Sequence, residues 1–330
     1  MKTFYEALDE FLELKESELK PYTKFGYAGR IKRLKELFAD LKLEDITTEE
    51  VQDYVDDWQK KYSVSTINGY LLIIKQVLEQ NGIKLERINV KNDKPRKLRL
   101  YSAVDIEKVE QYYLDHKEKT KVHHLPIFIA LYTGMRFGEI LGLQWLDIDL
   151  DRGLIDVSKN AQEIKENGKR KKIIQTPKTL SSNRTIAIPQ QLIEILKPFQ
   201  PKEDEDWEKY VCSGKSEPHD KRSISKSAEK LLAKAGVDWQ GFHAFRHSYA
   251  TRMMEKNIPV KAISDLLGHN NIGTTMNIYS HTTNDFKKEC VKKIFEDEKF
   301  KREKEKEILK NEVIKLQQQM NEIMIKIAEL

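Results

Sequence analysis

Side chains that could grip an anion lie close together in residues 240–281. His243 and Arg246 stand three positions apart in H-A-F-R, so on a helix both project from one face and could hold one ligand together. Apolar residues around them recur at spacings of three and four, which predicts a packed helical frame. Arg246 would repel a metal ion, so a metal site at His243 and His247 is not expected.

Tyr279 is the candidate nucleophile of the same stretch. Gly268 has the place of a helix C-cap, which leaves His269 in the turn beyond it. Thr274 or Thr275 could cap the next helix, which carries Tyr279. A phenol with a pKa of about 10 attacks poorly at neutral pH unless cations stabilise the phenolate. The nearby histidines and arginines are suitable cations.

Five blocks of the sequence resemble the tyrosine recombinases, also called lambda-type phage integrases. They are, in chain order, T-G-M-R-F-G-E-I-L-G-L (Thr133 to Leu143), T-P-K-T-L-S-S-N-R-T-I (Thr176 to Ile186), H-A-F-R-H (His243 to His247), L-L-G-H (Leu266 to His269) and I-Y-S-H (Ile278 to His281). Five blocks in the family's order make a chance resemblance improbable.

The resemblance implies a reaction in which Tyr279 attacks a DNA phosphodiester and leaves a 3′-phosphotyrosine bond and a free 5′-hydroxyl. The implied catalytic residues are Tyr279, Arg136, Lys178, His243, Arg246 and His269, with Glu139 as a supporting residue that positions Arg136. The arginines offer forks of donors to the phosphate, the histidines hydrogen-bond it or relay the tyrosine proton, and Lys178 protonates the departing oxygen. We therefore expect no cofactor, neither a metal ion nor ATP.

Composition is compatible with this function without establishing it. The chain has 330 residues, 58 Lys and Arg against 53 Asp and Glu, and a formal net charge of +5. No apolar run approaches the roughly 20 residues that span a bilayer, so we expect a cytoplasmic protein on DNA and no membrane partner. Cys212 and Cys290 lie far apart without a C-x-x-C partner, so neither a disulfide framework nor a zinc site is indicated.

The patterning predicts a mainly α fold with a small antiparallel β-sheet, an α+β class. Residues 1–85 read as four helices and residues 86–99 as an extended basic linker. The resemblance implies that the helical segment 1–85 is the core-site DNA-binding domain. Residues 100–298 form the expected catalytic domain. In it, strands near 154–157, 171–175 and 185–188 make one small sheet, with a hairpin turn at Asn167-Gly168. Residues 299–330 read as a C-terminal coiled-coil helix.

Basic residues of both domains are expected to contact DNA, because the resemblance implies a two-domain clamp. The expected DNA-binding residues are Lys20, Thr23, Lys24, Tyr27 and Arg30 at the second helix, Lys94, Arg96 and Lys97 in the linker, Lys169, Arg170 and Lys171 at the hairpin, and Arg184. The alternative for the second helix is an ordinary solvated face. If the basic linker runs along phosphates, the affinity for DNA should fall steeply as the salt concentration rises.

The expected partners are double-stranded DNA and further copies of the chain, with a tetramer on DNA. The resemblance implies that the helix near Phe286 to Phe295 exchanges into a neighbouring protomer; docking on its own domain is the alternative. Apolar residues from Leu309 to Leu330 recur at alternating spacings of four and three, a heptad seam. We favour an oligomerisation helix over one that folds back. An accessory DNA-bending or directionality factor is a further expected type of partner.

Four functions stay open at this point. The resemblance favours a site-specific recombinase, and the boxes at Arg136 and Lys178 favour the integrase of a phage or mobile element over a Xer-like resolvase of replicon dimers. A type IB topoisomerase uses similar chemistry but rejoins the original strand. A DNA-binding regulator without catalysis would not need Tyr279, Lys178 and both arginines.

Overall fold

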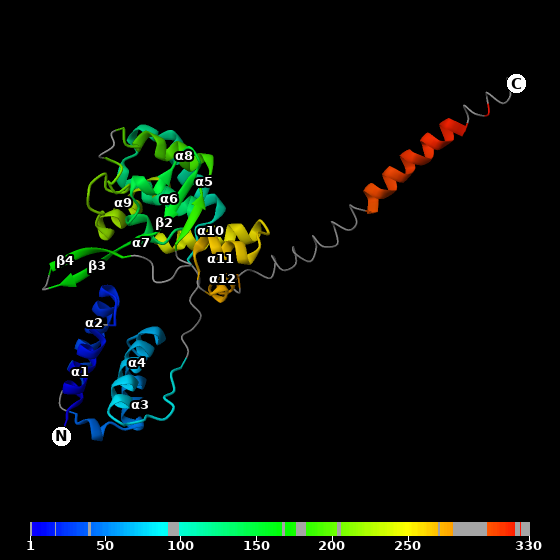
Figure 1. The fold of residues 1–330 in the computed structure, drawn as a ribbon. Helices are drawn as coiled ribbons and strands as arrows, with labels where there is room; N and C mark the ends of the chain where they lie inside the picture. The colour runs from blue at the N-terminus through cyan, green and yellow to red at the C-terminus, as the bar shows by residue number, and fades with distance from the viewer. Residues whose placement is uncertain are drawn as a thin grey trace.

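The ribbon of the computed structural model separates the helices before residue 85 from the elements after residue 100 (Figure 1). The structure describes residues 2–16, 18–38, 41–91, 99–166, 169–175, 183–202, 206–269, 271–279, 302–320 and 324. One large core of buried apolar side chains lies among the helices before residue 85, and a second lies after residue 100. A small third cluster is formed by Ala250, Met254, Ile263 and Leu267. The linker residues Lys94, Arg96 and Lys97 lie outside the described residues.

Helices α1 to α4 form the first core, as the amphipathic patterns of this segment predict. They are α1 (Phe4–Glu16), α2 (Pro21–Leu37), α3 (Thr48–Trp58) and α4 (Val64–Gln80), with a 3₁₀ turn at Leu43–Asp45. The Thr47 hydroxyl accepts from the backbone N–H of Glu50 and so caps α3. The rings of Phe38, Tyr54 and Trp58 contact one another in the core between these helices.

The second core is built around a short helix that is apolar on all sides. Its helices are α5 (Ala103–Asp115), α6 (Leu125–Thr133), α7 (Phe137–Leu141), α8 (Gln190–Leu196), α9 (Lys221–Lys234), α10 (Phe242–Glu255), α11 (Val260–Leu267) and α12 (Ile272–Tyr279). Shorter 3₁₀ turns lie at Lys117–Lys119, Val122–His124, Trp145–Asp147 and Lys197–Phe199. Nearly every side chain of α6 is buried, as the run L-P-I-F-I-A-L-Y predicts. Ser102 and Asp105 form the expected capping box before α5.

Within the described residues, the strands form two sheets and not the single sheet expected. Strands β1 (Ile148–Asp149), β2 (Leu154–Val157) and β5 (Arg184–Ala187) make an antiparallel sheet in the order β1-β2-β5. Strands β3 (Asn160–Glu166) and β4 (Lys169–Gln175) pair only with each other. The expectation was wrong because the return strand pairs with residues 160–166, which show no strong strand pattern, and not with β2. Mainly α with small antiparallel sheets nevertheless describes the fold.

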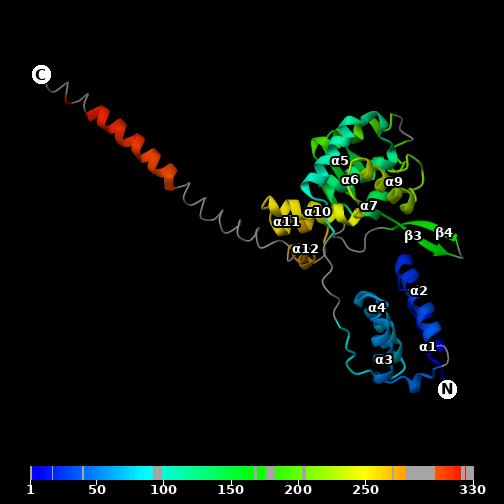
Figure 2. The same ribbon diagram turned by 180° about the vertical axis from the view of Figure 1, so that it is seen from behind.

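The β3–β4 hairpin lies beside α2 in both views of the ribbon (Figures 1 and 2). The hairpin is thus a part of the second domain that lies against the first group of helices. Its turn residues Asn167 and Gly168 lie outside the described residues. On β4, Lys169, Arg170 and Lys171 are exposed, which keeps them accessible to a polyanion.

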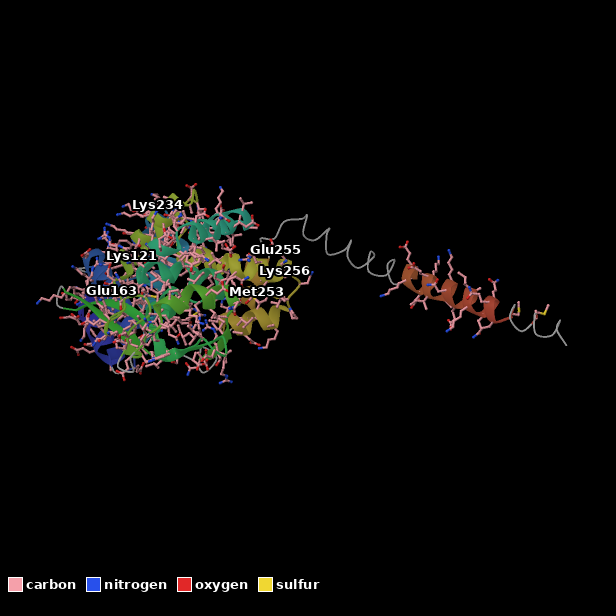
Figure 3. The ribbon with its side chains drawn as sticks, turned by 90° about the horizontal axis from the view of Figure 1, so that it is seen from above. Lys121, Glu163, Lys234, Met253, Glu255 and Lys256 are labelled. Carbon is pink, nitrogen blue, oxygen red and sulfur yellow. The ribbon has the colours of Figure 1, made fainter. Side chains whose placement is uncertain are left out.

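The last described segment is a helix over residues 302–320 whose residues are all exposed. Figure 3 shows its side chains projecting around the helix. The expected helix at Phe286 to Phe295 lies outside the described residues. Among the residues that the structure describes, no helix has the length and apolar character needed to cross a membrane.

Candidate active site

Arg136 lies in the turn between α6 and α7, where a glycine ends α6. Gly134 has a φ of 62°, in the left-handed region, and a Cβ at this position would lie 2.6 Å from the ring of Tyr249. The Arg136 backbone N–H and its Nη1 both donate to the Glu139 carboxylate, each at 2.9 Å. Its Nη2 donates to the carbonyl of Gly268 at 2.7 Å. The predicted pairing of Arg136 with Glu139 is therefore confirmed as a contact.

Arg246 projects from α10 into the interior and is 3% exposed. Its Nη1 donates to the carbonyl of Gly134, and its Nη2 to the carbonyl of Leu267, both at 2.8 Å. Burial and the positive charges of Arg136 and Arg184 lower the pKa of Arg246, but a guanidinium with this donor set keeps its charge. Arg246 thus joins the turn after α6 to the end of α11.

Arg184, which we expected to contact DNA, has its side chain buried inside the site in this structure. Its side chain is only 7% exposed, its Nη2 donates to Glu139 at 2.8 Å, and its Nε donates to the carbonyl of Leu266 at 2.8 Å. The reason is the strand pattern of β5, in which Arg184 shares a face with the fully buried Ile186. Arg184 therefore supports the site from inside.

The C-terminal end of α11 gathers these arginines. We call Arg136, Arg184 and Arg246 the arginine cluster. Leu266, Leu267 and Gly268 each direct a backbone carbonyl to a different member of this cluster. The last carbonyls of a helix lack intrahelical partners and carry the negative end of its dipole, which favours cations there. L-L-G-H is thus a scaffold for positive charge as well as the carrier of His269.

Glu139 is the negative charge inside the cluster and is 4% exposed. Burial alone would raise the pKa of its carboxyl, but the hydrogen bond and charge of Arg184 and the charge of Arg136 outweigh it and lower the pKa. The carboxylate is therefore ionised at neutral pH. Three guanidinium groups against one carboxylate leave an excess of positive charge for an anion.

His243 begins the exposed side of the site, one turn before Arg246 on α10. Its ring lies 4.6 Å from the ring of His247, measured between centroids. Partial burial and the charges of Arg246 and Arg136 lower the pKa of His243. His243 is thus largely neutral at pH 7 and can donate or accept a hydrogen bond.

His269 lies in the turn after α11, as the glycine pattern predicts. Gly268 has a φ of 66° and ends the helix. The Nδ1 of His269 is 2.7 Å from the hydroxyl of Thr275, which leaves Nε2 for another group. The expected cap at Thr274 or Thr275 was wrong, because α12 begins at Ile272.

The side chain of Asn271 takes the expected capping role, since its Oδ1 accepts from the backbone N–H of Gly273 at 2.7 Å. Thr275 is instead fully buried in the middle of α12. Its contact with His269 had no signal in the sequence beyond the hydroxyl itself. It joins α12 to the turn that carries the histidine.

Two stacked rings hold the starts of α7 and α10 together. Phe137 and Phe242 lie 3.9 Å apart between centroids and are nearly parallel, at 9°. Phe137 directly follows Arg136, and Phe242 directly precedes His243. The stack thus ties the backbone that carries Arg136 to the backbone that carries His243.

The structure brings Arg136, Arg246, His243 and His269 together, as the family resemblance implies. Tyr279 is the last residue of α12, one turn after Thr275, and its side chain lies outside the described part of the chain. Lys178 lies outside the described residues as well. Of the expected DNA-binding residues in the first core, Lys20 precedes α2, and Thr23, Lys24, Tyr27 and Arg30 lie on it.

Acidification is expected to destabilise the fold between pH 6.5 and 4. The pKa of each of His124, His247 and His269 is lowered to about 4, first by burial and then by neighbouring positive charges. In the unfolded chain these rings titrate near 6.5, so the unfolded state binds more protons in this window. The free energy of unfolding therefore decreases as the pH is lowered from 6.5 to 4. Urea midpoints at pH 7, 6 and 5 measure this, and His247→Gln is expected to flatten the trend. A midpoint independent of pH would contradict it.

Gly268→Ala is expected to lower both stability and activity, for two reasons that a control separates. A left-handed φ costs a non-glycine residue about 1–2 kcal/mol. A Cβ at Gly268 would also lie 2.9 Å from the Nη1 of Arg184, and such crowding adds about 1–3 kcal/mol. Gly236 has a φ of 71° with nothing near its Cβ position. Gly236→Ala therefore measures the first cost alone in urea unfolding, and equal losses in both variants would contradict a role for Arg184.

Fold and site together define a mainly helical protein with a cationic cluster suited to a phosphate group. Comparison with protein families assigns the chain further: residues 103–285 match the model of the phage integrase family, and residues 3–59 match the phage integrase N-terminal SAM-like domain. The chain belongs to the phage integrase family, the lambda-type tyrosine recombinases. The predicted family is thereby confirmed.

Relatives of two kinds are similar to the chain. A "Tyrosine recombinase XerC-like" protein of Caldanaerobacter subterraneus subsp. tengcongensis is 37% identical over 199 residues, which cover 55% of this chain and 50% of that protein. The integrase of Staphylococcus phage L54a is 27% identical over 332 residues, covering 88% of this chain and 92% of the phage protein. The chain thus matches half of the first relative and nearly all of the second.

Solved structures share the fold at low identity. The Tn1549 transposon integrase in complex with circular intermediate DNA superposes with a TM-score of 0.70 at 19% identity, over 89% of this chain and all of that one. A lambda integrase tetramer bound to a Holliday junction gives 0.54 at 21% identity, over 84% of this chain and 77% of that one. These likenesses confirm the two-domain fold.

Proposed function

We propose that the chain is a site-specific DNA recombinase that cuts and rejoins strands through a 3′-phosphotyrosine bond. The observation that carries this proposal is the arginine cluster on the end of α11, with His243 and His269 beside it. Such a cluster suits the charge that builds on a phosphate as it is attacked. Family membership supplies the reaction class, and Tyr279, at the end of the helix tied to His269, supplies the nucleophile.

In this mechanism the Oη of Tyr279 forms a bond to phosphorus as the bond from phosphorus to the 5′-oxygen breaks. Arg136 has a side chain that is 36% exposed, so it reaches the phosphate from the solvent side of the cluster, and Arg246 fixes the base of the site. His243 or the Nε2 of His269 takes the phenolic proton or binds a phosphate oxygen. Lys178 gives a proton to the departing 5′-oxygen.

The covalent intermediate keeps the free energy of the phosphodiester bond, so rejoining needs no ATP. The guanidinium groups stabilise the negative charge on the phosphate, as metal ions do in metal-dependent nucleases. A 5′-hydroxyl of a different strand can then attack the phosphotyrosine and release Tyr279. That exchange is recombination. Arg184 and Glu139 act by holding Arg136 and the end of α11 in place.

The biological role that we favour is integration or excision of a phage or other mobile element. The phage L54a integrase is similar along nearly the whole chain, and the Tn1549 transposon integrase, solved with circular intermediate DNA, shares the fold. The XerC-like relative matches only about half of each chain. Resolution of replicon dimers is therefore the second candidate.

Domain roles and partners complete the proposal. Residues 1–85 bind the core site and residues 100–298 carry catalysis, with the linker 86–99 along the DNA and the chain acting in the cytoplasm. Four protomers assemble on DNA, which the lambda integrase tetramer supports by its fold, and a DNA-bending or directionality factor assists. Lys24, Arg30, Lys169 and Arg170 contact phosphates in this arrangement.

A nicked suicide substrate tests the proposal. Its design lets the short fragment diffuse away after cleavage, so the phosphotyrosine bond is trapped and the protein shifts on a denaturing gel. We expect attachment in the presence of EDTA and without nucleotide, at a site taken from the DNA that flanks the gene. Cleavage that needs magnesium and leaves no covalent complex would overturn the mechanism. Relaxation of plasmid lacking a recombination site would instead indicate a topoisomerase.

A further inference from the structure

The C-terminal helix over residues 302–320 exposes apolar side chains that its own chain does not cover. Leu309, Leu316 and Met320 are each 60% exposed, and Val313 is 53% exposed. These four residues follow alternating spacings of four and three. In the sequence the same spacing continues through Ile323, Ile327 and Leu330. A repeating apolar stripe of this kind is the seam of a coiled coil, and the exposed Ile308 and Ile314 lie outside it.

Most of a helix's stability in proteins comes from packing its apolar face against another element. All residues over 302–320 are exposed, so within the described chain this helix gains no such packing. The helix therefore needs a partner that buries the seam.

The residue types on the seam select the number and direction of strands. Counting Leu309 as position d of a heptad places Val313 at position a and Leu316 at the next d. The next heptad has Met320 at a and Ile323 at d, and the last heptad returns to a β-branched residue at a, Ile327, with Leu330 at d. β-Branched residues at a with leucine at d favour two parallel strands over three or four.

Flanking charges agree with a parallel, in-register pair. In such a pair each g position faces the e position of the partner five residues further on. Glu305 at g then faces Lys310 at e, which is attractive, and Glu312 faces the neutral Gln317.

We propose that this helix joins two copies of the chain as a parallel two-stranded coiled coil in the absence of DNA. The partner is thus a second copy, and the contact is symmetric about a two-fold axis along the coil. The pairing does not depend on recombination activity. Combined with DNA binding, a preformed two-fold dimer would engage two inverted half-sites cooperatively, because the second binding event becomes intramolecular.

Light scattering after gel filtration of the full chain tests the pairing. We expect a mass of about twice the chain's 38.8 kDa, and a monomer for Leu316→Glu, because a carboxylate cannot be buried in the seam. Ile314 provides the matched control, since it is 52% exposed on the same helix but lies at position b, off the seam. Ile314→Glu is expected to stay dimeric. A monomeric wild type, or a loss of the dimer in Ile314→Glu alone, would overturn the proposal.

Cysteine pairing tests the direction and register. In a Cys290→Ser background, Leu309→Cys places a thiol at position d, where it faces its own copy in a parallel in-register pair. Oxidation is expected to give a disulfide-linked dimer on a non-reducing gel. Ile308→Cys, one residue earlier and off the seam, is expected to give far less. A dimer by light scattering with no selective cross-link at 309 would contradict the parallel arrangement.

Discussion

Tyr279→Phe is expected to abolish covalent attachment to DNA while leaving DNA affinity within about two-fold of the wild type. Phenylalanine keeps the ring and the helix but lacks the oxygen that bonds to phosphorus, so no intermediate can form. The rest of the site holds the arginine cluster through α11, and these contacts involve no atom of Tyr279. The suicide-substrate gel measures attachment, and fluorescence anisotropy of labelled core-site DNA measures affinity.

Tyr132→Phe is the matched control, because it removes a phenolic oxygen from the same domain whose hydrogen bond goes to Glu110 and not to the arginine cluster. The Tyr132 hydroxyl donates to Glu110 at 2.7 Å, and its loss should leave attachment intact. If Tyr279→Phe still attached to DNA, the nucleophile would be another residue. If it lost both attachment and DNA affinity, Tyr279 would act in binding.

Local spacing explains how much of the site the sequence predicts. Arg136 and Glu139 are three residues apart at a helix start, so their contact follows from helix geometry. Gly268 signals the helix end, and His269 follows it. These relations join residues that are neighbours in the chain, and periodicity encodes them.

Contacts between distant segments were not predictable in this way. Arg184 meets Glu139 across 45 positions of sequence, and no local pattern pairs a strand residue with a helix start. Arg184 lies two residues before the apolar Ile186 on the same strand, and this spacing did indicate that the Arg184 side chain points inward. Thr275 likewise binds His269 only because α12 packs back against the turn.

In the fold, too, local features were predictable from the sequence and non-local pairings were not. Amphipathic periodicity and capping residues predict α1 to α4 and α6, since each depends on its own segment. The separate β3–β4 sheet was missed because strand pairing is a choice between non-local partners, and β3 (Asn160–Glu166) has little apolar alternation.

Glu139→Gln is expected to destabilise the second domain by about 3–5 kcal/mol, the usual cost of breaking a buried ion pair from one side. The amide keeps the shape of the carboxylate but loses its charge. Arg136 and Arg184 would then stand close together and near Arg246 with no negative side chain between them. Urea unfolding at pH 7 measures the loss. Attachment to the suicide substrate should slow by about 100-fold, the effect of misplacing a catalytic group by about 1 Å.

Asp265→Asn separates this effect from a general loss of surface charge. Asp265 lies on α11 and pairs with Lys261 at 2.7 Å, but both side chains are more than half exposed, so its neutralisation should cost less than about 1 kcal/mol. Added salt should weaken that exposed pair and leave the Glu139 contacts almost unchanged. A Glu139→Gln protein as stable as Asp265→Asn would mean that the carbonyls of Leu266, Leu267 and Gly268 suffice to hold the arginines. Its attachment rate would then show whether Glu139 sets their orientation.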